Sequence, residues 1–207
     1  GNQITRKGTP ESFEAVKRTL DAIQQGLADN PAMPAATGLK LANQAVYHFN
    51  EEAKSSSGAS AVVLRDLGGR LEVAHVGNCR AYLFRADKLT LLTEDHSLIN
   101  DYKRFADGKF DEQALARYRN IITRAVGMTA DLEPTITNVI PQPGDLLLLC
   151  SDGLHGFVYD DELEHFMKAG EPHPGVICQL LLEATLGSTP ADDNIAIMVL
   201  RVPGEAP

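Results

Sequence analysis

The chain has 207 residues, of which 43% are hydrophobic and 23% charged, a composition typical of one ordinary globular domain and not of a disordered chain. Its formal net charge of −9 argues against a general affinity for nucleic acid or for an anionic membrane, since both require basic patches. No apolar run approaches the length of a membrane span, and Cys79, Cys150 and Cys178 lack a metal-binding spacing, so we expect reduced thiols in a cytoplasmic protein.

Two amphipathic helices are predicted at the start of the chain. Thr9, Pro10 and Glu11 combine a hydroxyl N-cap, a first-turn proline and an acid near the positive end of the helix dipole. Apolar residues then recur at steps of three and four, which predicts one buried face: Phe13, Val16, Leu20, Ile23 and Leu27. Pro34 opens a second helix with a stripe of Leu39, Ala42, Val46 and Phe49. We expect the two helices to form an antiparallel pair that covers a sheet.

The middle of the chain is predicted to be an antiparallel meander. Apolar runs separated by turn residues indicate strands at 59–64, 71–76, 79–84 and 89–92, with tight turns at Gly68-Gly69 and at Ala86-Asp87-Lys88. The stretch 98–120 has an irregular helical pattern, and we expect Tyr102, Phe105 and Leu115 to make its contacts.

The second half alternates strands and helices. A strand is predicted at 134–140, helices at 160–168 and 176–186, and a last strand at 195–202. Four consecutive leucines between Asp145 and Cys150 indicate a strand buried on both faces. We therefore expect a single α+β domain over 1–207, with an antiparallel sheet or two stacked sheets and with flexible ends at 1–8 and 203–207.

Acidic residues mark the ends of two predicted strands. Asp152-Gly153 follows the leucine strand, and Asp192-Asp193-Asn194 precedes the last strand. Such residues could converge on a divalent cation that prefers oxygen ligands, or they could simply form turns. Asp95-His96 is a further candidate polar cluster, with the alternative that it lies in a solvent-facing N-cap for a helix that begins near Ser97.

Five motifs in order together resemble the type 2C family of metal-dependent protein serine/threonine phosphatases. The first, His75-Val-Gly-Asn-Cys-Arg80-Ala-Tyr-Leu, is similar to the family's "HVGDSRAYL" hairpin. The others are Leu92-Thr-Glu-Asp95-His96-Ser97-Leu, Thr123-Arg-Ala-Val-Gly127, Pro143-Gly144-Asp145 leading into Leu149-Cys-Ser-Asp152-Gly153-Leu154, and Asp193-Asn194-Ile195. The resemblance covers about residues 9–202.

The resemblance implies a four-layer αββα sandwich of two antiparallel sheets flanked by helix pairs. It also implies two divalent metals, Mn²⁺ or Mg²⁺, and a metal-activated water that hydrolyses phosphoserine or phosphothreonine in proteins. On the matching positions Asp152 and Asp193 would be metal ligands, Asp95 would serve a weaker third metal, and Gly153 and Asn194 would shape the turns of the site. The expected partners are phosphorylated protein substrates, including targets of Ser/Thr kinases in signal transduction, with no nucleic acid and no membrane.

Several family features are missing from these residues. The "RxxNxDA" and "DGMGGH" motifs, which supply a phosphate-binding Arg and further metal positions, do not occur. Gly156 replaces the second acid of "SDGLTD", and Asn78-Cys79 replaces Asp-Ser, a pair to which we assign a structural turn role. The sequence is therefore either an incomplete part of an active phosphatase, which we expect, or a catalytically impaired binding module, or a chain whose site is completed by a second segment. We expect the 98–120 stretch to influence substrate choice.

Overall fold

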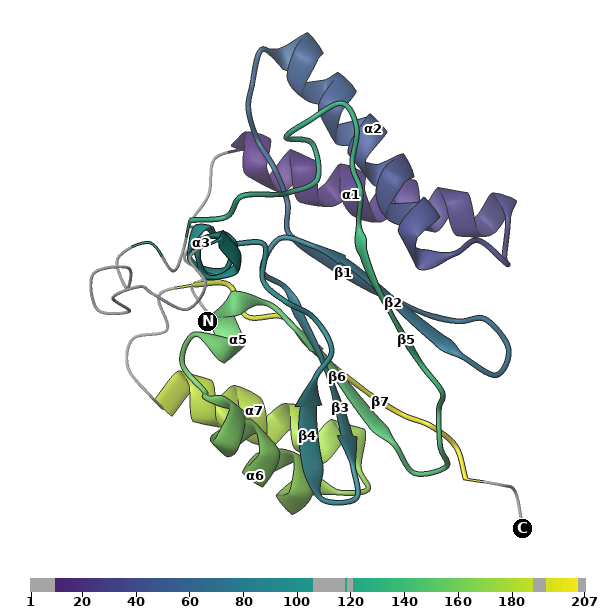
Figure 1. The fold of residues 1–207 in the computed structure, drawn as a ribbon, viewed down its shortest axis with the longest axis vertical. Coiled ribbons are helices and arrows are strands. Elements are labelled where there is room, and N and C mark those ends of the chain that lie inside the picture. The colour runs from purple at the N-terminus through teal and green to yellow at the C-terminus, as the bar shows by residue number, and fades with distance from the viewer. Residues whose placement is uncertain (1–9, 106–117, 119–120, 188–192, 205–207) are drawn as a thin grey trace, which may run out of the picture.

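Two antiparallel sheets stack face to face in the computed structural model, which describes residues 10–105, 118, 121–187 and 193–204 (Figure 1). The helices are α1 (Pro10–Asp29), α2 (Ala35–Ala53), α3 (Leu98–Phe105), α5 (Asp152–His155), α6 (Asp160–Gly170) and α7 (Pro174–Gly187). The strands are β1 (Ala61–Asp66), β2 (Leu71–Val76), β3 (Arg80–Arg85), β4 (Lys88–Leu91), β5 (Thr135–Val139), β6 (Leu146–Cys150) and β7 (Ile197–Arg201). The α+β prediction is confirmed.

The strand order separates the chain into an upper and a lower sheet. The upper sheet runs β1-β2-β5 and the lower sheet β4-β3-β6-β7. The predicted hairpins β1–β2 and β3–β4 both form, but each sheet also needs a partner from later in the chain, since β5 pairs with β2 and β6 with β3. The meander is therefore divided between the two sheets.

The leucine strand β6 is buried on both faces, as its sequence predicts. Leu146, Leu148 and Cys150 point toward α6 and α7, where they join Leu163 and Ile177 in one hydrophobic cluster. Leu147 and Leu149 point the other way and pack against residues of the upper sheet. This alternation follows from the two-residue period of a strand, and it places β6 at the centre of the lower half of the molecule.

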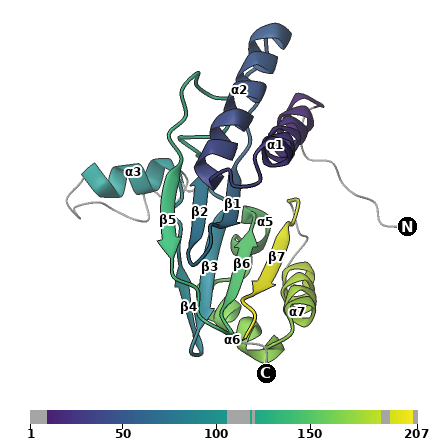
Figure 2. The same ribbon diagram turned by 90° about the vertical axis from the view of Figure 1, so that its right-hand side faces the viewer.

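The helix pair α1–α2 covers the upper sheet, but α1 is oriented differently from the prediction. The helix α2 lies on β1 and β2, and α1 packs on α2 (Figure 2). Phe13, Val16 and Leu20 are exposed, whereas the buried residues of α1 are the small ones, Ala15, Thr19 and Gly26.

The small residues of α1 are the buried ones because α1 and α2 approach each other closely. A Cβ added at Gly26 would lie 2.8 Å from the Leu41 side chain and 2.9 Å from the Met33 side chain, so a larger residue here would require both side chains to move. The predicted face of α1 was therefore wrong in its three leading residues.

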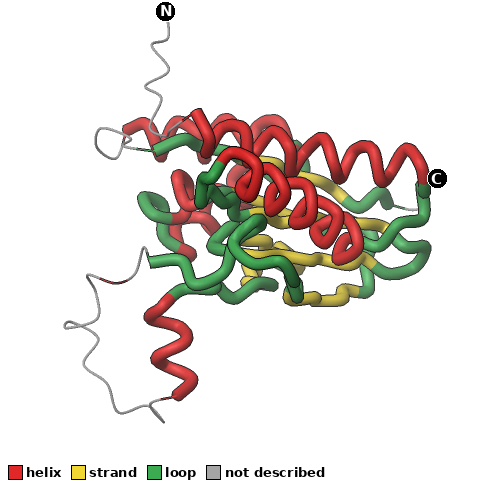
Figure 3. Tube along the Cα trace, turned by 90° about the horizontal axis from the view of Figure 1, so that it is seen from above, coloured by secondary structure: helices red, strands yellow, loops and turns green. Residues whose placement is uncertain are grey.

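Two further sequence predictions on helices are corrected. Tyr102 and Phe105 are exposed, because α3 projects away from the sheets (Figure 3). The helix predicted at 176–186 begins two residues earlier, at Pro174; its buried residues are Ile177, Leu181 and Thr185, while Val176 faces solvent.

Some predictions lie outside the described residues, namely those on Thr9, Leu115, Asp192 and the chain ends at 1–8 and 205–207. Within the described ranges, no helix has both the length and the apolarity needed to cross a membrane.

Candidate functional site

Asp152 stands where the buried strand β6 gives way to the short helix α5. Its Oδ2 accepts a hydrogen bond from Nδ2 of Asn78 at 2.9 Å. The pairing of β3 with β6 explains this contact: Arg80 pairs with Cys150, and Asn78 and Asp152 each lie two residues beyond that pair. The two side chains therefore meet at the same edge of the lower sheet.

The Asp193-Asn194 turn packs directly against the start of α5. A Cβ on Gly153 would overlap the carbonyl oxygen of Asn194, so only glycine allows this approach. The Ser151 hydroxyl donates a hydrogen bond to the Asn194 carbonyl oxygen at 3.2 Å, and its Oγ accepts one from the Ala196 N–H at 3.0 Å. The structure thus brings together the two segments that carry the predicted ligands Asp152 and Asp193, with Gly153 and Asn194 at their contact.

Asp95 is held by an arginine. Its two carboxylate oxygens accept from Nε and Nη2 of Arg80 at 2.9 and 2.8 Å, and its side chain is 14% exposed. Burial alone would lower the pKa of the Arg80 guanidinium, but the hydrogen bonds and charge interactions with Asp95 and Tyr82 together outweigh it and raise that pKa. Asp95 would have to leave this pair before it could bind a metal, so its ligand role stays a prediction.

The histidine beside Asp95 is buried, with 2% of its surface exposed, so this cluster does not face solvent, although Ser97 caps α3 as predicted by accepting from the Asn100 N–H at 3.4 Å. Its ring stacks on that of His75 with the centroids 4.7 Å apart. Nδ1 of His96 accepts from the Gly77 N–H at 3.1 Å, and Nε2 therefore carries the proton and donates to Thr135 Oγ1. Burial, followed by the neighbouring His75, lowers the pKa of His96 to about 4, so the ring is neutral near pH 7.

His155 joins the site from α5. Its Nε2 donates to the main-chain carbonyl of Asn78 at 2.9 Å, because a carbonyl can only accept. Burial, reinforced by Arg80, lowers the pKa of the imidazole. The neighbouring Gly156 is exposed.

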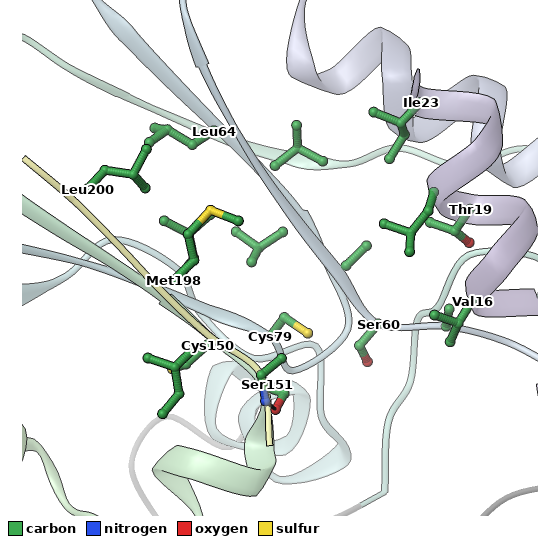
Figure 4. A pocket seen from close by; sticks show the side chains of 18 residues that line it. Val16, Thr19, Ile23, Ser60, Leu64, Cys79, Cys150, Ser151, Met198 and Leu200 are labelled. Carbon is green, nitrogen blue, oxygen red and sulfur yellow. Dashed lines mark hydrogen bonds between the residues drawn. The ribbon is translucent and has the colours of Figure 1, made fainter. Parts of the chain in front are cut away.

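An apolar groove with a cavity volume of about 490 Å³ runs beside the site (Figure 4). Its walls come from α1, strand β1 and the β6–β7 edge: Val16, Thr19, Leu20, Ile23, 59–64, Cys79, 149–151, 196–198 and Leu200. In the part of the chain that the structure describes, β1 pairs only with β2 and β7 only with β6, so both sheets present an unpaired edge to this groove. Ser60, Cys79 and Ser151 line it at the end where Asn78 and Asp152 lie.

The residues present fit part of a metal centre. Asp152 and Asp193 offer the carboxylate oxygens that Mg²⁺ and Mn²⁺ prefer. Among the described residues, however, no group of three or more His, Cys, Asp or Glu side chains is arranged to hold a metal ion. The donor chemistry therefore suits the ion, while the number of ligands is short of a complete site.

Sequence reasoning singled out the two acidic positions as candidates but not the residues around them. Asn78 was given a structural turn role, and His155 and Ser60 had no role. The signal that would have found Asn78 is the register of β3 against β6, which brings residues 78 and 152 together once Arg80 and Cys150 are paired. That register depends on a long-range pairing with no local signature in the sequence.

Comparison with known proteins gives consistent matches. The family model described as Protein phosphatase 2C matches residues 11–192. The serine/threonine phosphatase stp of Listeria innocua is 30% identical over 203 residues, which covers 95% of this chain and 79% of that protein. The protein phosphatase PhpP of Streptococcus pneumoniae is 30% identical over 135 residues, and the match spans 65% of this chain and only 55% of PhpP.

Solved structures show the same fold. The serine/threonine phosphatase PstP/Ppp of Mycobacterium tuberculosis superimposes with a TM-score of 0.81 at 26% identity, covering 95% of this chain and 84% of that one. The catalytic domain of PstP in complex with two manganese ions gives a TM-score of 0.76 at 26% identity, covering 92% of this chain and 81% of that one. Because the family model spans most of the chain and a 30% identical relative covers 95% of it, this chain belongs to the protein phosphatase 2C family.

Proposed function

We propose that this chain is part of a metal-dependent phosphatase that hydrolyses phosphoserine and phosphothreonine in proteins. The observation that carries the proposal is the contact of Gly153 with Asn194, which holds the segments of Asp152 and Asp193 against each other at one edge of the sandwich. Membership of the protein phosphatase 2C family supports the same reaction.

In this proposal Asp152 and Asp193 hold two Mn²⁺ or Mg²⁺ ions, and Gly153 and Asn194 keep the two segments in contact. The bound ions would activate a water molecule and neutralise the charge that develops on the phosphate. Asp95 would contribute to a weaker third site after releasing Arg80.

The apolar groove supports an incomplete site over an inactive one. Two unpaired strand edges offer main-chain donors and acceptors to an extended segment, and the groove between them offers apolar contacts for its side chains. We infer that the active protein adds such a segment here. Because the groove ends beside Asp152, the segment could bring the remaining metal ligands to the site.

The proposed substrates are phosphorylated proteins, among them the targets of Ser/Thr kinases. The relatives stp and PstP are named as serine/threonine phosphatases, which supports this class. A cytoplasmic location is part of the proposal, supported by three cysteines that are all unpaired. The net charge of −9 supports the absence of nucleic acid among its partners.

A second candidate function is a catalytically impaired member that acts as a binding module in signalling. It is favoured by the short set of ligands among the described residues and by Gly156 in place of an acid. Such a protein would bind a partner without binding metal tightly.

The test is Mn²⁺-dependent hydrolysis of an aryl phosphate by this chain and by a longer version extended at its N-terminus. We expect Asp152→Asn and Asp193→Asn each to reduce turnover of the active form by at least about 100-fold, beyond the effect typical of outer-shell residues. Asp131→Asn, the same change at an exposed turn, serves as the control and should leave turnover unchanged.

Three outcomes separate the alternatives. Turnover that survives in either variant removes that residue from the site. Turnover restricted to the longer protein supports a site completed by the added segment. If neither form binds Mn²⁺ nor turns over substrate, the binding module replaces the enzyme as the function.

A further inference from the structure

Asn78 bonds through every one of its polar groups. Its main-chain N–H donates to Ser60 Oγ at 3.3 Å, and its main-chain carbonyl accepts from His155 Nε2 at 2.9 Å. In the side chain, Oδ1 accepts from Ser60 Oγ at 2.8 Å and Nδ2 donates to Asp152 Oδ2 at 2.9 Å. A simple turn residue would not need a side chain fixed at both ends.

The surroundings determine which way the amide points. Because Ser60 Oγ accepts from the Asn78 N–H, its own hydrogen is directed to Oδ1, and the amide group is left to face Asp152. The opposite orientation would place an amide oxygen against a carboxylate oxygen, which is repulsive. Asn78 therefore acts as a donor toward Asp152.

Ser60 is itself held in place by the backbone beside Asn78. A Cβ added to Gly77 would overlap the side chain of Ser60, so the serine packs directly on the main chain at that glycine. A line of contacts thus runs from Gly77 through Ser60 and Asn78 to Asp152. Each contact restricts the side-chain conformations of the next residue in this line.

The type of residue at this position matters as much as its contacts. A carboxylate here would face Asp152 Oδ2 at hydrogen-bond distance and repel it, whereas the neutral amide donates to it. The amide therefore orients the Asp152 carboxylate without placing a like charge beside it.

We propose that Asn78 is a positioning residue for Asp152: its amide holds the carboxylate in the orientation that receives the metal, and it thereby sets the affinity of the site. This inference rests on the proposed metal-dependent function. Outer-shell partners of metal ligands are known to act in this way, and their loss typically weakens metal binding by about 10- to 100-fold.

The first test measures free Mn²⁺ by electron paramagnetic resonance, in whichever form of the protein, the 207-residue chain or its longer version, takes up the ion. We expect Asn78→Ala to weaken Mn²⁺ binding by about 10- to 100-fold. Ser60→Ala keeps the amide but loosens it, so it should have a smaller effect in the same direction. The control Asn138→Ala, at an exposed asparagine on β5, should leave the affinity unchanged.

The second test needs no metal. Urea midpoints are compared in metal-free buffer for Asn78→Ala, Asp152→Ala and the double variant. If the amide acts on Asp152, the two single shifts should add to more than the shift of the double variant. Asn78→Asp keeps the Ser60 contact and replaces the donor with a charge, and it should lower the midpoint more than Asn78→Ala does.

The outcomes distinguish this inference from the proposed function. Unchanged Mn²⁺ affinity in Asn78→Ala, with normal binding by the wild type, would overturn the inference alone. Fully additive urea shifts would overturn it as well, whatever the metal result. If neither form of the wild type binds Mn²⁺, the proposed function is overturned and the claim about affinity with it.

Discussion

The stacked pair His75 and His96 lies beneath the loop that carries Asp95. His75 Nε2 donates to the Glu94 carbonyl at 2.9 Å, and His96 bonds to Gly77 and Thr135. Protonation of His96 would place a hydrogen on Nδ1, where it would face the Gly77 N–H and destroy that bond. The folded state therefore requires a neutral ring.

We predict that stability falls as the pH drops from about 6.5 to about 4. The pKa of His96 is near its ordinary value of 6.5 in the unfolded chain and about 4 in the folded protein, so the unfolded state binds more protons between these values. The stabilisation is complete above pH 6.5 and is lost as the pH falls toward 4, by roughly 3 kcal/mol in total. Urea unfolding at a series of pH values measures it.

The control for this pH dependence is a second histidine. His96→Asn should flatten the slope between pH 6.5 and 4, whereas His48→Gln, at an exposed position on α2, should keep it. An identical slope in wild type and His96→Asn would show that other groups cause the effect.

At the level of elements, α1 shows that an apolar stripe is not always the buried face. The stripe of Val16, Leu20 and Ile23 lines the groove, while Ala15 and Gly26 lie against α2 residues. Periodicity detects apolar residues but cannot detect a face of small residues chosen for close helix packing. The helix itself was predictable, and its orientation was not.

We predict opposite sensitivities on the two faces of α1. Ala15→Leu should lower the free energy of unfolding by about 1–3 kcal/mol, because Ala15 is fully buried and extra methyl groups overpack the site. Leu20→Ala should cost less than about 1 kcal/mol, since Leu20 is 55% exposed. Chemical denaturation measures the free energy of unfolding of both variants. A larger loss in Leu20→Ala than in Ala15→Leu would mean that the apolar stripe is buried in solution.

The difference between local sequence patterns and long-range contacts also explains how much of the candidate site was predictable. Asp152 and Asp193 stand out because acids at the ends of apolar strands have a local signature. Asn78 has none, because its role depends on the β3–β6 register and on the orientation of Ser60. Local patterns locate the candidate ligands, and tertiary contacts decide what surrounds them.

At the scale of the whole molecule, the pairing of the sheets was beyond local sequence reasoning. The elements and their order followed from periodicity and turn residues, but the assignment of β2 to one sheet and β3 to the other did not. The element pattern left open one antiparallel sheet or two stacked sheets, and the resemblance to the phosphatase family implied the stacked pair. The groove and its two unpaired strand edges became visible only in the structure.

We predict that the groove binds a hydrophobic dye and that a charge at its wall prevents this. Met198→Lys, at a 57% exposed position on β7 in the groove, should reduce the fluorescence of a bound naphthalene-sulfonate dye by at least about half. Ile140→Lys makes the same kind of change at a residue that is 69% exposed and outside the groove, and it should have little effect. Equal reductions in the two variants would place the dye elsewhere, and weaker dye binding by the longer protein would support a filled groove.

The place of β7 in the lower sheet has a consequence for biosynthesis. The strand β6 emerges from the ribosome well before β7, with α6 and α7 between them, yet β7 is the partner that covers its second edge. Asp193 emerges just before β7, so a nascent chain can place Asp152 early but cannot bring the Asp193 turn against Gly153 until translation has passed the last strand. The two segments that carry the proposed ligands would therefore come together late in synthesis, once β7 has joined the lower sheet.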